Sequence, residues 1–121
     1  MARKKYIMPA NEIQALVSGF MQFGPEDLYN KMKAKALMIM DKSYVLDEEF
    51  LDRAEIFLKK AREEPDNSDD SPSLKDIYYT LSFMLKRLGN EIHRKYKKEN
   101  TNEERFLRVM TNDKVPKLMV K

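Results

Sequence analysis

The chain has 121 residues, of which 42% are hydrophobic and 36% are charged, and it contains no cysteine. A chain of this length can bury one hydrophobic core but not two, so we expect a single domain over 1–121. The lack of cysteine excludes a disulfide framework, a thiolate zinc site and a cysteine nucleophile, and it favours a reducing, cytoplasmic location.

Glycine is rare, with 3 residues in the whole chain, whereas average proteins contain about 7%. Sandwiches, barrels and nucleotide-binding sheets need glycine at turns and where backbone approaches phosphate, so these folds are disfavoured. Leucine, methionine, lysine and arginine, which favour helices, are abundant. We predict an all-α fold, a single-domain bundle of about five helices. The expected helices are 9–22, 25–41, 47–63, 74–98 and 101–111.

The first part of the chain contains a basic arm, 1–8, followed by two predicted helices. Apolar residues from Ile13 to Met21 recur at helical spacing. Gly24 and Pro25 then end one helix and begin another, because glycine commonly terminates helices and proline suits a first turn.

Capping signals mark the later helices. Asp47 is a predicted N-cap for the third helix, which ends before an acidic, flexible loop at 65–73. Ser73 and Asp76 form a capping-box-like start to the longest helix. The segment 112–121 is an apolar tail that is too short to form much structure by itself.

The net charge of +3 conceals an asymmetry along the chain. The segment 1–46 carries +3, the segment 47–73 carries −6 and the segment 74–121 carries +6. Such asymmetry indicates polyanion binding or self-association and says nothing about fold.

The longest helix ends in a dense basic cluster that lies opposite its apolar stripe. A helix end with several cations can neutralise phosphates, and the basic arm has a similar composition. No helix-turn-helix signature is present, so contact is expected with the nucleic-acid backbone and not with the bases. The residues predicted to bind nucleic acid are Arg3, Lys4, Lys5, Lys86, Arg87, Arg94, Lys95, Lys97 and Lys98. A solvated surface, or pairing of these cations with the acidic segment 47–73, is the competing interpretation.

A methionine-rich apolar surface supports a second hypothesis. The chain has nine methionines, and the run Leu37, Met38, Ile39 and Met40 is apolar all around its helix. Such a run is either buried or covered by a partner. The sequence therefore predicts a non-enzymatic helical binding protein, either an accessory factor on nucleic acid or a protein-interaction module, adaptor or homo-oligomer.

Catalytic chemistry finds little support. His93, the only histidine, lies among cations that disfavour its protonation and metal binding, so it is predicted to be a surface residue. Glu49 with Arg53, and Glu55 with Lys59, have the spacing of ordinary helical ion pairs. No phosphate-binding glycine loop or membrane-spanning apolar run is present. We expect no enzyme activity, cofactor, metal or small-molecule substrate.

Overall fold

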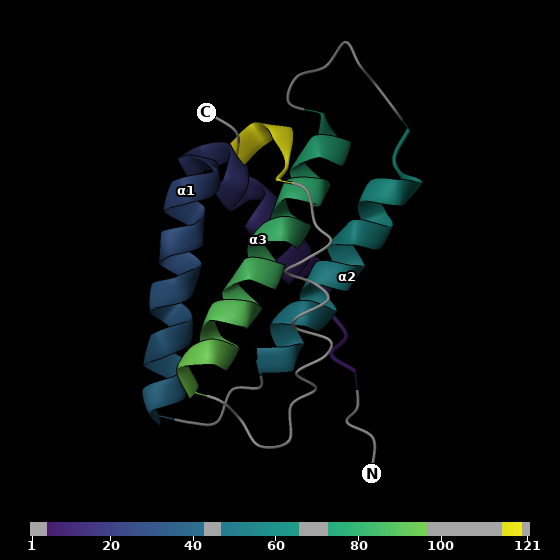
Figure 1. The fold of residues 1–121 in the computed structure, drawn as a ribbon. Helices are drawn as coiled ribbons and strands as arrows, with labels where there is room; N and C mark the ends of the chain where they lie inside the picture. The colour runs from purple at the N-terminus through teal and green to yellow at the C-terminus, as the bar shows by residue number, and fades with distance from the viewer. Residues whose placement is uncertain (1–4, 43–46, 66–72, 97–114, 120–121) are drawn as a thin grey trace.

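The computed structural model describes residues 5–42, 47–65, 73–96 and 115–119. Within these ranges the regular elements are all helical: α1 (Ala10–Lys42), α2 (Asp47–Glu63), α3 (Leu74–Tyr96) and a short 3-10 helix, η1 (Lys117–Met119). Helices α2 and α3 and the second half of α1 run side by side, while the first half of α1 crosses behind α3 (Figure 1). The all-α prediction is confirmed.

The predicted count of five helices is not supported, because the described residues form three α-helices. The segments 9–22 and 25–41, predicted as separate helices, are the two helical stretches of α1, and they meet at the non-helical Gly24. A sharp kink divides this helix at Gly24, where φ is 82° and ψ is 169°. Essentially only glycine adopts this backbone conformation, so the sequence signal marks a change of direction inside α1.

The other predicted helix boundaries agree closely with the structure. The helix predicted over 47–63 is α2, and the helix predicted over 74–98 is α3 as far as it is described. The Oγ atom of Ser73 accepts a hydrogen bond from the backbone N–H of Asp76 at 3.1 Å, as the capping signal predicts. The helix predicted over 101–111, and most of the loop 65–73 and of the tail 112–121, lie outside the described residues.

Helix α3 lies between α1 and α2 and supplies much of the hydrophobic core (Figure 1). Leu81 and Leu88 are fully buried, and both pack in one cluster with Phe57 of α2. Polar residues of α3 are buried as well, because a central helix is covered on more than one side. The hydroxyl of Ser82, for example, donates a 2.8 Å hydrogen bond to the backbone oxygen of Ala54 in α2.

The prediction that His93 lies on the surface is wrong, since only 8% of the residue is exposed. Its Nδ1 atom lies 2.9 Å from Oδ2 of Asp47, which is completely buried. Oδ1 of Asp47 accepts the backbone N–H of Glu48, so this carboxylate serves both the start of α2 and the end of α3. The helical stripe identified one buried face of α3 but not the face that packs against the first turn of α2.

Candidate functional site

The residues predicted to bind nucleic acid are dispersed. Lys5 is exposed, and its Nζ forms a 2.8 Å ion pair with Glu55 of α2. Lys86 is half-buried, whereas Arg87 and the pair Arg94 and Lys95 are exposed on α3. Arg3, Lys4, Lys97 and Lys98 lie outside the described residues.

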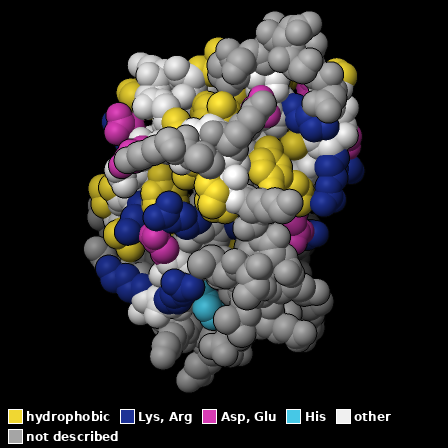
Figure 2. Space-filling view, turned by 45° about the horizontal axis from the view of Figure 1, so that its top comes forward, with side chains coloured by type: hydrophobic (Ala, Val, Ile, Leu, Met, Phe, Trp, Pro, Cys, Tyr) yellow, Lys and Arg dark blue, Asp and Glu magenta, His cyan; other side chains and the backbone are white. Residues whose placement is uncertain are grey.

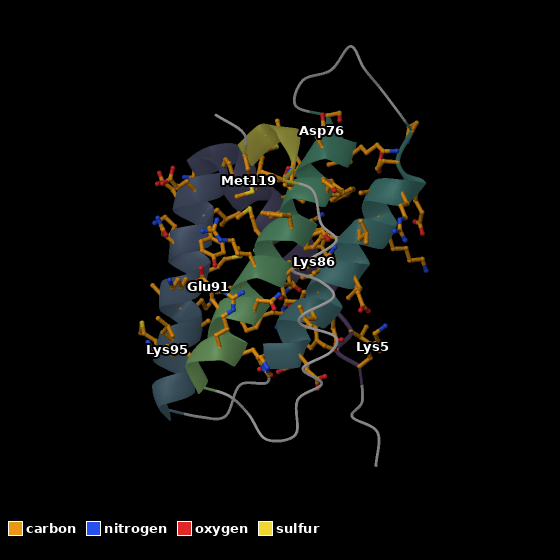
Figure 3. All side chains as sticks on the ribbon, viewed as in Figure 1. Lys5, Asp76, Lys86, Glu91, Lys95 and Met119 are labelled. Carbon is orange, nitrogen blue, oxygen red and sulfur yellow. The ribbon has the colours of Figure 1, made fainter. Side chains whose placement is uncertain are left out.

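The described end of the basic arm and the end of α3 point to different sides of the molecule. Figure 3 places Lys5 beside α2 and Lys95 on the opposite side, beside α1. On the face drawn in Figure 2, lysine and arginine side chains form separate groups, with acidic and hydrophobic side chains between them. The described cations therefore do not form one continuous positive surface on that face.

The arm is held against the helices by its own contacts. The backbone N–H of Tyr6 donates to Oδ2 of the buried Asp52 at 3.0 Å, and its hydroxyl donates to Glu12. Arg53 lies over the Tyr6 ring, 4.0 Å from its centroid, and its Nε is 2.8 Å from Oε1 of Glu12. Burial and then the hydrogen bond to Glu12 raise the pKa of Tyr6. These contacts give this part of the arm a structural role, joining α1 to α2.

The predicted protein interface is only partly described. Leu37 is half-buried, and Met38 has 61% of its surface exposed. Both lie in the second half of α1, where a solvent-open hollow separates α1 from α3. The side chains of Ile39 and Met40 lie outside the described part of the structure.

We call this hollow the α1–α3 groove. It has a volume of about 370 Å³. Its floor is apolar and its edges carry charged side chains from both helices. The residues that line it are Lys33, Leu37, Leu88, Glu91, Ile92, Arg94 and Lys95. The groove therefore brings one predicted interface residue, Leu37, together with two predicted phosphate-binding residues, Arg94 and Lys95.

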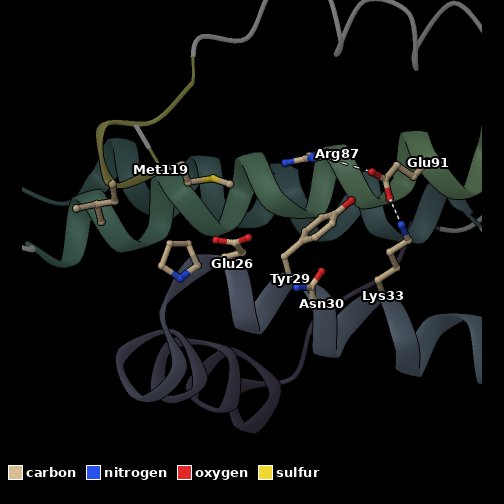
Figure 4. Close-up of a pocket in the computed structure, with 9 residues that line it drawn as sticks. Glu26, Tyr29, Asn30, Lys33, Arg87, Glu91 and Met119 are labelled. Carbon is tan, nitrogen blue, oxygen red and sulfur yellow. Dashed lines mark ion pairs between the residues drawn. The ribbon is translucent and has the colours of Figure 1, made fainter. Parts of the chain in front are cut away.

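A second hollow, which we call the Tyr29 cleft, adjoins the groove and has a volume of about 420 Å³. It lies between α1 and α3, beyond the kink, and η1 borders one end (Figure 4). The two hollows share Lys33 and Glu91. The residues that line the cleft are Pro25, Glu26, Tyr29, Asn30, Lys33, Arg87, Glu91, Leu118 and Met119.

Glu91 is the electrostatic link between the two hollows. Its Oε2 lies 3.1 Å from Nζ of Lys33 on α1, and its Oε1 lies 3.8 Å from Nε of Arg87 on α3. Burial alone would raise the pKa of Glu91, but Tyr29, Lys33 and Arg87 together outweigh it and hold that pKa below its ordinary value. Glu91 is therefore held as a carboxylate between α1 and α3.

Tyr29 places a hydroxyl deep in the cleft. Only 7% of the residue is exposed, and its hydroxyl lies near the Glu91 carboxylate without forming a hydrogen bond of good geometry to any described residue. Burial, followed by the nearby Glu91 carboxylate, raises the pKa of Tyr29, so this group is a neutral phenol. The Arg87 guanidinium lies over the ring, 5.0 Å from its centroid.

Sequence reasoning missed most of the Tyr29 cleft. Glu91 is conspicuous in the sequence only as the one acidic residue inside the basic cluster of α3. Glu26 follows Pro25 in the first turn of a predicted helix, where a carboxylate has an ordinary structural role. The cleft depends on which turn of α1 faces which turn of α3. The spacing of residues within one helix does not predict how two helices align.

The structure offers no assembled metal site within the ranges it describes, since no three histidine, aspartate or glutamate side chains converge there. Among the same residues, no helix is both long and apolar enough to cross a membrane. Comparisons with family models, with curated proteins and with solved structures found no match to this chain.

Proposed function

We propose that this chain is a non-enzymatic protein-interaction module whose α1–α3 groove binds an amphipathic helix of a partner protein. The observation that carries the proposal is a hollow that opens to solvent between two helices, with the half-buried Leu37 on its wall and the buried side chains of Leu88 and Ile92 beneath it. Helical partners commonly bind such grooves by laying their apolar face along the floor. The exposed Met38 extends the apolar surface, and methionine adapts easily to a partner's shape.

The charges along the groove select the partner. Arg94 and Lys95 supply two cations, while the charge of Lys33 is balanced by its ion pair with Glu91. A helix with acidic side chains beside its apolar stripe complements this edge, and a basic helix is repelled. The partner is therefore an acidic amphipathic helix.

The groove is short, and its length sets the expected strength of binding. From Leu88 to Lys95 the α3 wall spans about 10 Å at a helical rise of about 1.5 Å per residue. Two turns of a partner helix fill this length, which corresponds to a small, transient interface. We expect affinity in the micromolar range, set by the apolar surface that Leu37 and Met38 expose and tuned by charge.

Nucleic acid is the alternative ligand for the same cations. That hypothesis joined the arm to the end of α3, but Lys5 and Lys95 lie on opposite sides of the molecule (Figure 3). Lys5 is also paired with Glu55. These observations favour a protein partner, and the same titration can distinguish the two.

The test uses fluorescence anisotropy with a labelled helical peptide of alternating leucine-rich and glutamate-rich faces. A matched peptide with lysine in place of every glutamate is the first control, and labelled duplex DNA and single-stranded RNA are the second. The acidic peptide should bind at micromolar concentration and the basic peptide should not. Equal binding of both peptides, or of neither, contradicts the proposal, and a preference for DNA or RNA that falls steeply with salt favours the alternative.

Charge-reversal variants locate the site. The double substitution Arg94→Glu with Lys95→Glu should weaken binding of the acidic peptide at least about tenfold, because it replaces attraction with repulsion. The matched control is Lys59→Glu with Arg62→Glu, which makes the same change of charge at exposed positions on α2. Light scattering over a range of concentrations tests for a second copy of the chain as the occupant, and a dimer that disappears in the α3 variant would replace the proposed partner.

A further inference from the structure

The Tyr29 cleft is a separate hollow with the size of a small-molecule site. Its volume of about 420 Å³ falls in the range of about 300–1,000 Å³ that is typical of ligand pockets. Figure 4 shows that its walls come from facing turns of α1 and α3, with Met119 of η1 at one end. Three elements distant in sequence thus enclose one space.

The charged groups of the cleft sum to zero, and one of each sign remains available. Glu91 is held by Lys33 at 3.1 Å. Glu26 has no ion-pair partner within the described ranges, and Arg87, which lies over the Tyr29 ring, meets Glu91 at 3.8 Å through Nε and has 51% of its side chain exposed. Glu26 and Arg87 come from opposite walls of the cleft (Figure 4). A carboxylate and a guanidinium therefore flank the same space.

The hydroxyl of Tyr29 is a second, independent observation that indicates a ligand. Tyr29 is more than nine-tenths buried, and its hydroxyl makes no hydrogen bond of good geometry to a described residue, although the Glu91 carboxylate, which Lys33 holds, lies near it. Buried hydroxyls in folded proteins nearly always have a partner. Because this phenol is neutral, it can donate its proton to a ligand oxygen in the cleft.

These features restrict the ligand to one chemical class. An anion alone would be repelled by Glu26 and Glu91, and an amine alone would be repelled by Lys33 and Arg87. A zwitterion meets both requirements, with its carboxylate at Arg87 and the Tyr29 hydroxyl and its ammonium at Glu26. Leu118 and Met119 provide an apolar wall for a side chain.

We propose that the Tyr29 cleft binds a free α-amino acid with an apolar side chain. This site is additional to the α1–α3 groove and does not depend on the proposed helical partner. It also departs from the expectation, based on sequence, that the chain has no small-molecule ligand. The carboxylate of the amino acid accepts hydrogen bonds from Arg87 and Tyr29, and its ammonium donates to Glu26.

The test titrates the full chain with L-leucine and L-methionine and follows backbone amide shifts by NMR. Both should produce saturable shifts in residues of the cleft. N-acetyl-leucine lacks the ammonium, and leucinamide lacks the carboxylate, so each should bind at least about tenfold more weakly, as expected from the loss of one charge-assisted contact. Glutamate and lysine should also bind weakly, because each adds a net charge.

Substitutions test which residue contacts the ammonium of the ligand and which contacts its carboxylate. Glu26→Gln should weaken leucine binding and remove the preference for leucine over N-acetyl-leucine. Arg87→Gln should weaken leucine binding and remove the preference for leucine over leucinamide. Glu63→Gln and Arg62→Gln, which neutralise exposed residues at the end of α2, are the matched controls and should change nothing. Circular dichroism confirms that each variant remains folded.

Two results would overturn the proposal: no saturable shift with leucine or methionine up to about 20 mM, or equal binding of leucine and doubly blocked N-acetyl-leucinamide. The proposal for the α1–α3 groove and the proposal for the Tyr29 cleft can be contradicted independently of each other. The α3 double variant, Arg94→Glu with Lys95→Glu, should bind leucine normally, and Glu26→Gln should still bind the acidic peptide.

Discussion

Asp47 and His93 join the first turn of α2 to the last turn of α3, with 2.9 Å between Oδ2 and Nδ1. Asp47 is fully buried, and the side chain of His93 is 9% exposed. The variant Asp47→Ala removes the carboxylate and leaves the histidine nitrogen facing a cavity. Because a buried hydrogen bond to a charged group is lost, we expect the free energy of unfolding to fall by about 2–3 kcal/mol in urea denaturation.

The control for this variant is Glu49→Ala in the same first turn of α2. It removes the same favourable interaction with the helix dipole but no buried partner. We expect a loss below about 1 kcal/mol. Equal losses in the two variants would mean that Asp47 acts only through the dipole and that the contact with His93 contributes nothing to stability.

The kink of α1 depends on Gly24. Its φ of 82° with a ψ of 169° is strained for any residue that carries a Cβ atom, although a Cβ there would meet no other atom within 4 Å. Gly24→Ala should therefore lower the free energy of unfolding by about 1–3 kcal/mol through backbone strain alone. Gly19→Ala is the control, because Gly19 is helical and its new Cβ would meet only the flexible Leu28 side chain, at 3.1 Å. Thermal unfolding should separate the two variants, with Gly19→Ala changing stability by less than about 1 kcal/mol.

The starts and breaks of helices were predictable because their signals are local. The Ser73 hydroxyl lies three residues before the N–H that it accepts, and the Gly24 and Pro25 pair marks the kink directly. The count of five helices is not supported, because the two stretches on either side of Gly24 form one kinked element and the fifth predicted helix, 101–111, lies outside the described residues. Local chemistry predicted the break itself, since Gly24 has a non-helical φ and ψ between the two helical stretches of α1.

Contacts between helices were not predictable from helical spacing. Spacing assigned Arg53 to Glu49 within α2, whereas the structure pairs Arg53 with Glu12 of α1. His93 was assigned to an exposed face because a single stripe of apolar residues defined the buried one. Both errors have the same cause, since the packing of a second helix against a given face is decided by tertiary structure. The Tyr29 cleft was missed for this reason also.

Arg53 connects the arm, α1 and α2 through Tyr6 and Glu12. The guanidinium and the Glu12 carboxylate are both partly buried, with 18% and 28% of their side chains exposed. Arg53→Ala removes the ion pair with Glu12 and the stacking on Tyr6. We therefore expect the free energy of unfolding to fall by about 1–2 kcal/mol. Arg62→Ala, at an exposed position in the last turn of α2, should cost less than about 0.5 kcal/mol. Equal effects in chemical denaturation would show that the arm contributes no stability through Arg53.

The pKa of Glu91 predicts how acid weakens the contact between α1 and α3. Burial raises that pKa, but Tyr29, Lys33 and Arg87 lower it further, so in the folded chain it lies below the ordinary value of 4.5. A carboxyl group whose pKa is depressed on folding contributes stability that is present above its unfolded pKa and is lost as pH falls through its folded pKa. Wild type should therefore be more stable than Glu91→Gln at neutral pH, and the difference should shrink as pH falls below about 4.5. Urea denaturation of both proteins between about pH 3 and pH 7 measures this difference, with Glu63→Gln as the exposed control. A difference between wild type and Glu91→Gln that is constant across the range would mean that Glu91 stabilises the chain through packing and not through its charge.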